Sequence, residues 1–105
     1  MSDICTEQET TIEKETKAVS KEPKMYRVIF HNDNVTPFIF VVAILQELFH
    51  KNRENAYELA QSVHVDGKAV VAVYSFEIAE QKRDETISIS RTAGYPLQVT
   101  IEEEQ

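Results

Sequence analysis

HNDNVTPFIFVVAILQELF, residues 31–49, joins a polar segment to the most apolar run of the chain. The polar segment, residues 32–34, leads through Thr36 and Pro37 into that run. Thr36 is a favourable N-cap, and Pro37 is a favourable first helical residue because that position needs no hydrogen-bonded N–H. The sequence therefore predicts a helix capped by Thr36, with a polar loop at its N-terminus.

The apolar residues of this run follow the repeat of an α-helix. Four of them recur at spacings of three and four and so share one face: Val41, Ile44, Leu45 and Leu48. We expect this face to pack against a core, and the first turn of the helix to border the polar loop.

Length, charge and apolar content restrict the class of protein. A chain of 105 residues with 42% hydrophobic residues can form one small domain. A net charge of -7 argues against a nucleic-acid partner, since no basic patch could offset phosphate repulsion. The apolar run over residues 38–45 is too short to cross a membrane, which needs about 20 residues. The single Cys5 and an acidic N-terminus without an apolar core favour a cytoplasmic location, and we expect a monomer.

The composition changes at residue 25. Residues 1–24 alternate six carboxylates and four lysines with Thr and Ser, and contain no aromatic residue. Such a segment cannot bury enough apolar area to offset the entropy of ordering. We predict a flexible N-terminal extension over residues 1–24, serving either as a solubilising leader or as an arm that contacts a partner. The folded domain is predicted over residues 25–105.

The remaining elements follow from local patterns. Residues 25–31 alternate as a strand does, and Asn52 is a favourable cap for a second helix. The nearly continuous apolar run of residues 69–74 suits a central strand buried on both faces. Ser75 could cap a third helix, although residues 86–90 also alternate as a strand would.

Gly94, followed by Pro96, favours the helical interpretation of that ambiguous segment, because this pair is typical of a helix C-terminus. Leu97, Val99 and Ile101 then alternate as a final half-buried strand. The predicted order is β-α-α-β-α-β. This order corresponds to a small α/β sandwich of the α+β type, with three helices on one face of a three-stranded sheet.

Three segments resemble the ClpS family, the adaptors that hand N-degron substrates to a Clp unfoldase: YRVIFHNDNVTPFIFVVAIL, VHVDGKAVVAVYSFEIAEQK and GYPLQVTIEEE. The resemblance covers about residues 25–104. It implies an adaptor that binds the free α-amino group and large hydrophobic first residue of a substrate. It also implies delivery to the N-terminal domain of ClpA or ClpC, for degradation by ClpP.

The resemblance assigns roles to individual residues. Side-chain carbonyls and a neutral imidazole can accept hydrogen bonds from an ammonium group. The residues implied in α-amino recognition are Asn32, Asp33, Asn34 and His64. The residues implied in the hydrophobic pocket are Phe30, Thr36, Phe38, Val41, Ala60, Val63 and Leu97. On the third helix, Glu77 and Lys82 match positions that dock on the unfoldase.

The chain departs from the family pattern at three of these positions. Asn34 stands where the family usually has a second aspartate, which predicts weaker binding of the ammonium group. Phe38 and Ala60 stand where the family commonly has methionines. Because alanine leaves space and phenylalanine is stiff, we expect a changed preference, with Ile and Val as candidates beside Leu, Phe, Tyr and Trp.

Two other functions compete with this one. A Clp regulator that docks on the unfoldase without binding N-degrons would tolerate Asn34. An enzyme would need His64 and an aspartate as base and orienter, with Cys5 as nucleophile. Cys5 lies in the predicted tail, only two glycines are present, and the three histidines lack the spacing of zinc ligands. The sequence therefore predicts no enzyme, no cofactor and no metal.

Overall fold

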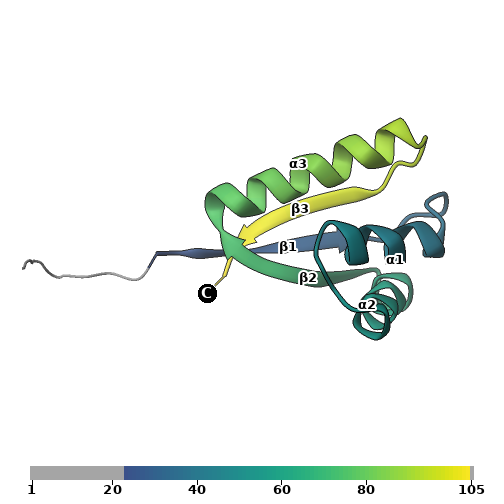
Figure 1. Cartoon of the computed structure of the whole chain (residues 1–105), viewed down its shortest axis with the longest axis horizontal. Helices are drawn as coiled ribbons and strands as arrows, with labels where there is room; N and C mark the ends of the chain where they lie inside the picture. The colour runs from purple at the N-terminus through teal and green to yellow at the C-terminus, as the bar shows by residue number, and fades with distance from the viewer. Residues whose placement is uncertain (1–22, 105) are drawn as a thin grey trace, which may run out of the picture.

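The computed structural model describes residues 23–104 of the chain (Figure 1). The elements, in chain order, are β1 (Met25–His31), α1 (Phe38–Glu47), α2 (Arg53–Asp66), β2 (Lys68–Ser75), α3 (Phe76–Thr92) and β3 (Gln98–Glu103). The predicted order β-α-α-β-α-β is confirmed. The predicted N-terminal extension, except for its last two residues, lies outside the described residues.

The three strands form one antiparallel sheet in the order β2-β1-β3. The prediction that residues 69–74 form the central strand is wrong, because β1 pairs with both neighbours and β2 lies at an edge. Val70 and Val73 of β2 are 41% and 38% exposed. The register shifts between Val28 and Ile29 of β1, so that Val71 is an extra residue of β2. Val71 is buried in the core, and this irregularity explains part of the unbroken apolar run.

All three helices pack on one face of the sheet. Val28 and Phe30 of β1 belong to the same buried cluster as Leu45 of α1, Ala60 of α2 and Ala79 of α3. Figure 1 shows α3 running along β3, while α1 and α2 lie toward the β2 side. The single cluster confirms the predicted layer of three helices over a three-stranded sheet.

The N-terminus of α1 differs from the prediction in its capping residue. The helix begins at Phe38, and the N-cap is Pro37, which has an extended backbone and makes no side-chain cap bond. Thr36 is therefore not the N-cap. Its hydroxyl instead donates to Oδ2 of Asp33, at 2.8 Å. By contrast, the predicted cap at Asn52 is confirmed, because its side chain accepts from the N–H of Asn55 at 2.8 Å.

The ambiguous segment over residues 86–90 is helical, as predicted. The hydroxyls of Thr86 and Ser90 each donate to a carbonyl one turn earlier in α3. Gly94 follows the helix with a φ of 86°, which a residue with a Cβ rarely adopts. The N–H groups of Gly94 and Tyr95 donate to carbonyls of the last turn. This pattern is a Schellman motif, and it turns the chain from α3 toward β3.

Candidate functional site

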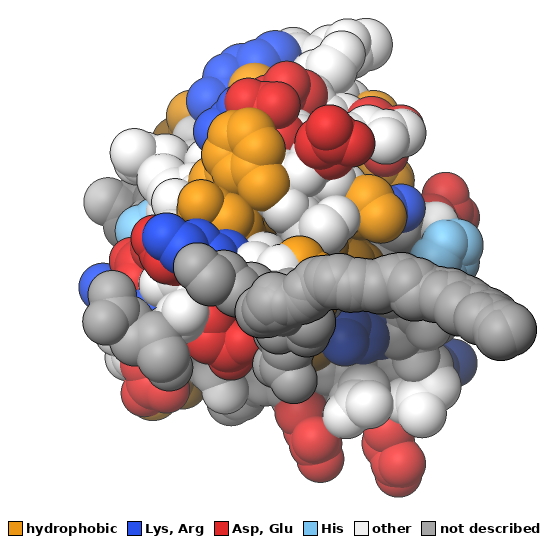
Figure 2. Space-filling model, turned by 90° about the vertical axis from the view of Figure 1, so that its left-hand side faces the viewer, with side chains coloured by type: hydrophobic (Ala, Val, Ile, Leu, Met, Phe, Trp, Pro, Cys, Tyr) orange, Lys and Arg blue, Asp and Glu red, His pale blue; other side chains and the backbone are white. Residues whose placement is uncertain are grey.

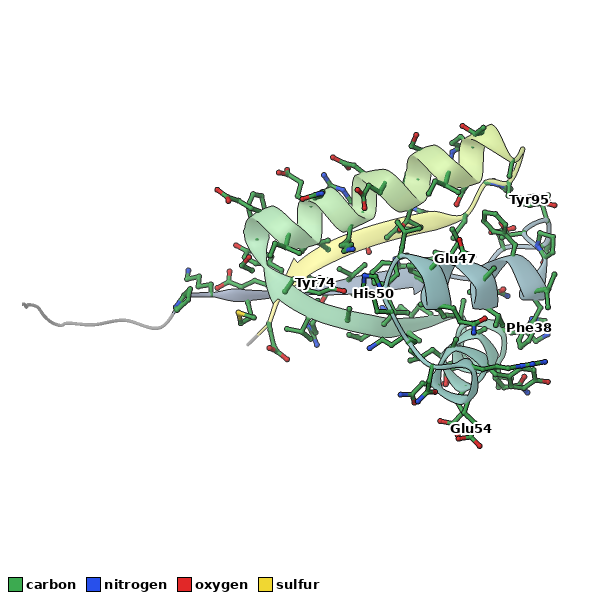
Figure 3. All side chains as sticks on the ribbon, viewed as in Figure 1. Phe38, Glu47, His50, Glu54, Tyr74 and Tyr95 are labelled. Atoms are coloured by element: carbon green, nitrogen blue, oxygen red, sulfur yellow. The ribbon has the colours of Figure 1, made fainter. Side chains whose placement is uncertain are left out.

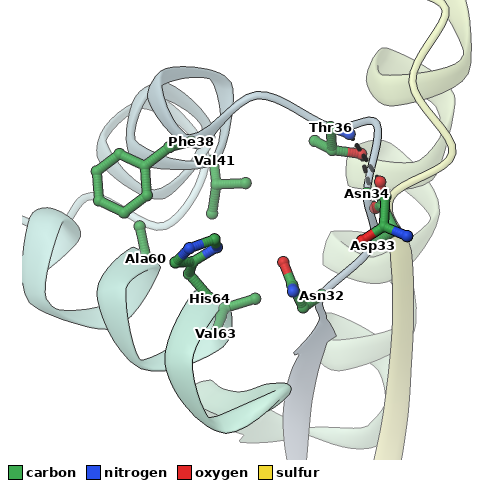
Figure 4. A pocket seen from close by; sticks show the side chains of 9 residues that line it. All are labelled: Asn32, Asp33, Asn34, Thr36, Phe38, Val41, Ala60, Val63 and His64. Atoms are coloured by element: carbon green, nitrogen blue, oxygen red, sulfur yellow. Dashed lines mark hydrogen bonds between the residues drawn. The ribbon is translucent and has the colours of Figure 1, made fainter.

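A pocket of about 250 Å³ opens between the loop after β1, the start of α1 and the second half of α2 (Figure 4). It combines polar groups at one side with apolar groups at the other. The lining residues are Asn32, Asp33, Asn34, Thr36, Phe38, Val41, Ala60, Val63 and His64.

The polar side of the pocket is assembled from two distant segments. The N–H of Asn32 donates to the carbonyl of Gly67 at 2.9 Å, which ties the end of β1 to the turn after α2. His64 lies in the last turn of α2, just before that turn. Figure 4 shows the Asn32 amide and the His64 ring pointing toward the same opening. Both side chains are exposed, so their acceptor atoms are available to a ligand.

Asp33 organises the loop between β1 and α1. Its Oδ1 accepts from the N–H groups of Val35 and Thr36, both at 2.7 Å. Its Oδ2 accepts from the Thr36 hydroxyl at 2.8 Å. Both carboxylate oxygens are therefore engaged within the loop, while the neighbouring Asn34 is exposed and lines the pocket.

These contacts change the acidity of the Asp33 carboxyl. Its partial burial raises its pKa, whereas the hydrogen bonds from Thr36 and Val35 lower it. The positive charge of Arg91 also lowers the pKa. The lowering effects prevail, and the pKa of Asp33 lies below its ordinary value of 3.8.

Asp33 should make stability depend on pH. A lowered pKa means that the carboxylate stabilises the folded state above about pH 3.8, and that this stabilisation is lost as the pH falls through the lower pKa of the folded protein. We expect Asp33→Asn to reduce the free energy of unfolding at neutral pH by about 1 kcal/mol, and to weaken its decline in acid. Urea unfolding at neutral pH and at about pH 3 measures both effects.

The exposed Asp66, at the end of α2, offers a matched control for that experiment. Asp66→Asn should leave the free energy of unfolding within about 0.5 kcal/mol of the original. Equal acid sensitivity of Asp33→Asn and the unsubstituted protein would contradict the assigned role of the Asp33 carboxylate.

The apolar side of the pocket is part of the core. Val41, Ala60 and Val63 are 6%, 2% and 2% exposed, respectively. Figure 4 shows the Ala60 methyl group directed toward the half-buried ring of Phe38. That ring packs edge-on against Tyr57, with 5.0 Å between the ring centroids. The ring of Phe38 therefore separates the pocket from the exposed side chain of Tyr57 on α2.

Phe30 and Leu97, which the resemblance implies in the pocket, do not line it. They are 0% and 1% exposed and belong to the core cluster. The ring of Phe30 packs edge-on against Phe49, with 5.5 Å between centroids. Phe30 alternates within β1, and Leu97, just before β3, continues the alternation of that strand, so the sequence pattern predicts such a core position equally well.

Tyr57 was not among the residues singled out from the sequence, although its ring supports Phe38. Its spacing from Ala60 was the available signal, because residues three apart on a helix share a face. That signal is weak without knowledge of which face of α2 meets the pocket.

Glu77 and Lys82 both lie on α3, which does not line the pocket. Glu77 is exposed in the first turn, near the exposed Phe76 and Ile78. Figure 2 views this end of the molecule and shows acidic, basic and hydrophobic side chains side by side. Lys82 is half-buried, and its Nζ donates to the carbonyl of Leu48 at 2.8 Å. Lys82 thus links α3 to the end of α1.

Neither a metal centre nor a membrane crossing is visible in residues 23–104. No group of three or more His, Cys, Asp and Glu side chains in this range could hold a metal ion. None of the helices in the same range combines the length and the apolar character that a membrane span requires.

Comparisons with known proteins agree on one family. The family model described as "ATP-dependent Clp protease adaptor protein ClpS" matches residues 21–100. The ClpS adapter of Paraburkholderia xenovorans is 43% identical over 94 residues, covering 90% of this chain and 89% of that protein. The ClpS adapter of Nautilia profundicola is 42% identical over 94 residues, covering 90% and 95%.

A solved structure shares both the fold and part of the sequence. Agrobacterium tumefaciens ClpS2, bound to L-phenylalaninamide, superimposes with a TM-score of 0.77 at 36% identity. The match covers 79% of this chain and all of the other chain, at 100%. The segments that form the pocket lie within the matched range of the family model, residues 21–100. The chain therefore belongs to the ClpS family of Clp protease adaptor proteins.

Proposed function

We propose that this chain is an N-degron adaptor, which binds the free α-amino group and the large hydrophobic first residue of a substrate. One observation carries the proposal: exposed acceptors on Asn32, Asn34 and His64 share a single pocket with buried apolar side chains. The A. tumefaciens relative was solved with L-phenylalaninamide, which has a free amine and a phenyl group. That ligand has the two features that the proposal requires of a substrate.

The polar side would distinguish a chain terminus from an internal peptide group. An α-ammonium donates three hydrogen bonds, and the amide oxygens of Asn32 and Asn34 and a neutral His64 ring can accept them. Hydrogen bonds to a charged group are worth about 1.5–3 kcal/mol each. An acetylated terminus lacks the charge and two of the donors. The pocket should therefore reject it.

Fluorescence anisotropy with short labelled peptides tests the proposal. One peptide begins with phenylalanine and a free amine, and its partner has the same sequence with an acetylated N-terminus. The proposal requires that the free-amine peptide binds and that acetylation removes binding. Equal binding of the two peptides would show that the terminus is not recognised.

Asn34→Asp should tighten binding of the free-amine peptide. A carboxylate at this position adds an ion pair with the α-ammonium, whereas the carboxylate of Asp33 is occupied by the loop. Because the site is exposed, we expect a gain of about 1 kcal/mol, or roughly fivefold in affinity. Anisotropy at low and high salt measures the gain, which should shrink as salt rises. Unchanged affinity at both salt concentrations would remove position 34 from the contacts.

The pocket should admit β-branched first residues. Ala60 contributes only a methyl group, and the Phe38 ring above it rests on Tyr57. We therefore expect peptides beginning with Ile or Val to bind within about tenfold of those beginning with Leu or Phe. Ala60→Met should widen that difference, since the added side chain occupies the pocket. A panel in which Ile and Val already rank far below Leu and Phe would contradict this expectation.

Delivery would require docking on the N-terminal domain of a ClpA- or ClpC-type unfoldase. The exposure of Glu77, together with the neighbouring Phe76 and Ile78, supports α3 as the docking surface. Lys82 would contribute to docking indirectly, by holding α3 in place, because its ammonium group donates to the carbonyl of Leu48. Glu77→Lys should then weaken binding of that domain without changing peptide binding.

A regulator that docks without binding N-degrons is the second candidate. The polar side of the pocket favours it, since the Asp33 carboxylate already accepts three hydrogen bonds within the loop and position 34 is neutral. The two candidates differ in one measurement. Docking on the unfoldase domain without any amine-dependent peptide binding would select the regulator.

A further inference from the structure

A second hollow, of about 320 Å³, adjoins the pocket on the surface between α1 and α2. Phe38 lines both cavities. Figure 3 shows Phe38 near the end of α1 that carries the pocket. We call this second hollow the α1–α2 groove. Its lining residues are Phe38, Ile39, Val42, Gln46, Arg53 and Tyr57.

The α1–α2 groove has an apolar part and a polar end. Ile39 and Tyr57 are 74% and 56% exposed, and they flank Val42, which is buried. Gln46 and Arg53 lie at the opposite end from Phe38, both exposed, and both carry N–H donors. Exposed large apolar side chains that continue directly from a ligand pocket are typical of an extended binding surface.

The length of the groove corresponds to a few peptide residues. From residue 38 to residue 46, α1 rises about 12 Å, at 1.5 Å per residue. An extended chain advances about 3.3 Å per residue. Three or four residues would therefore reach from Phe38 to Gln46. If the substrate chain leaves the pocket past Phe38, which lines both hollows, its following residues lie in the α1–α2 groove.

We propose that the α1–α2 groove binds the substrate segment that follows the first residue, and that it favours an apolar side chain at the second or third position. This inference rests on the proposed N-degron function. Ile39 and Tyr57 bury the apolar side chain, while Gln46 and Arg53 donate hydrogen bonds to peptide carbonyls. Adjacency to the pocket across their shared wall, Phe38, selects this occupant over a second copy of the chain.

Peptides that differ only after the first residue test the inference. All begin with phenylalanine and a free amine, and they carry leucine or serine at the second or the third position. Both positions are needed, because successive side chains of an extended chain point in opposite directions. At one of the two positions, leucine should bind about three- to tenfold tighter than serine.

Two substitutions assign that preference to the groove. Ile39→Ala should reduce the leucine preference to less than about twofold, and its high exposure makes a folding defect unexpected. Gln61→Ala is the matched control, since Gln61 is exposed on α2 and does not line the groove. The control should retain the full preference. Both variants should retain dependence on the free amine.

The outcomes separate this inference from the function on which it rests. Amine-dependent binding with equal affinity for all four peptides would overturn the proposed role of the groove and leave the proposed adaptor function intact. A leucine preference that survives in Ile39→Ala also overturns the groove. Absence of any amine-dependent binding overturns both proposals. Sedimentation at the peptide-binding concentration completes the test, since a dimer broken by Ile39→Ala would identify a second copy as the occupant.

Discussion

Asn32→Ala and His64→Ala are each expected to weaken binding of a free-amine, phenylalanine-first peptide by about 10- to 100-fold. Each substitution removes one acceptor for the α-ammonium, and a hydrogen bond to a charged group is worth about 1.5–3 kcal/mol. Because both side chains are exposed, the lower half of this range is expected for each variant. The double variant should lose at least about 100-fold.

Anisotropy with the free-amine peptide measures these losses, and the chain offers matched controls. His50 and Asn55 are exposed residues of the same types, and neither lines the pocket. His50→Ala and Asn55→Ala should bind within about twofold of the original protein. A His64→Ala protein that still binds within twofold would remove the imidazole from the recognition of the α-amino group.

Leu45→Ala is expected to lower the free energy of unfolding by about 2–5 kcal/mol. Leu45 is 0% exposed at the centre of the core that α1 shares with the sheet. Deleting its side chain leaves a cavity that the surrounding structure fills only in part. The loss is large for a small domain, in which total stability is about 5–15 kcal/mol.

Urea unfolding followed by circular dichroism measures the loss, and Glu47→Ala is the control on the same helix. Glu47 is exposed, so its truncation should change the free energy of unfolding by no more than about 0.5 kcal/mol. A loss of less than about 1 kcal/mol in the free energy of unfolding of Leu45→Ala would show that the packing of α1 does not depend on the buried Leu45 side chain. The position of α1 also shapes the pocket, because Val41 on the same helix lines it.

Local sequence signals were sufficient for the order of the elements. The helical repeat of α1 and the cap at Asn52 involve residues three or four apart, and the same holds for the turn at Gly94. Such residues are neighbours in space whatever the rest of the chain does, so their pattern can be interpreted without a tertiary structure. The helix over residues 86–90 was predicted on this basis, from the glycine and proline beyond it.

The resemblance to a family identified the residues that line the pocket, but it also assigned to the pocket two residues that lie deeper in the core. Nine of the implied residues line one pocket. Phe30 and Leu97 lie in the core instead. An inward-facing side chain on the sheet lines a cavity only where the helices packed against it leave space, and otherwise it is buried in the core. The alternation of apolar residues predicts which face of the sheet a side chain is on, but not how closely the helices pack against it.

By itself, the sequence determined the elements, their order and the polar loop before an apolar helix, because these depend on residues close together in the chain. The tertiary structure alone decided that β1 is the central strand, because strand position depends on pairing between segments that are distant in the chain. It also decided that Lys82 donates to the carbonyl of Leu48, which lies 34 residues earlier in the chain. Both features join segments that are distant in the chain, so local patterns do not report them and only the folded arrangement brings the partners together.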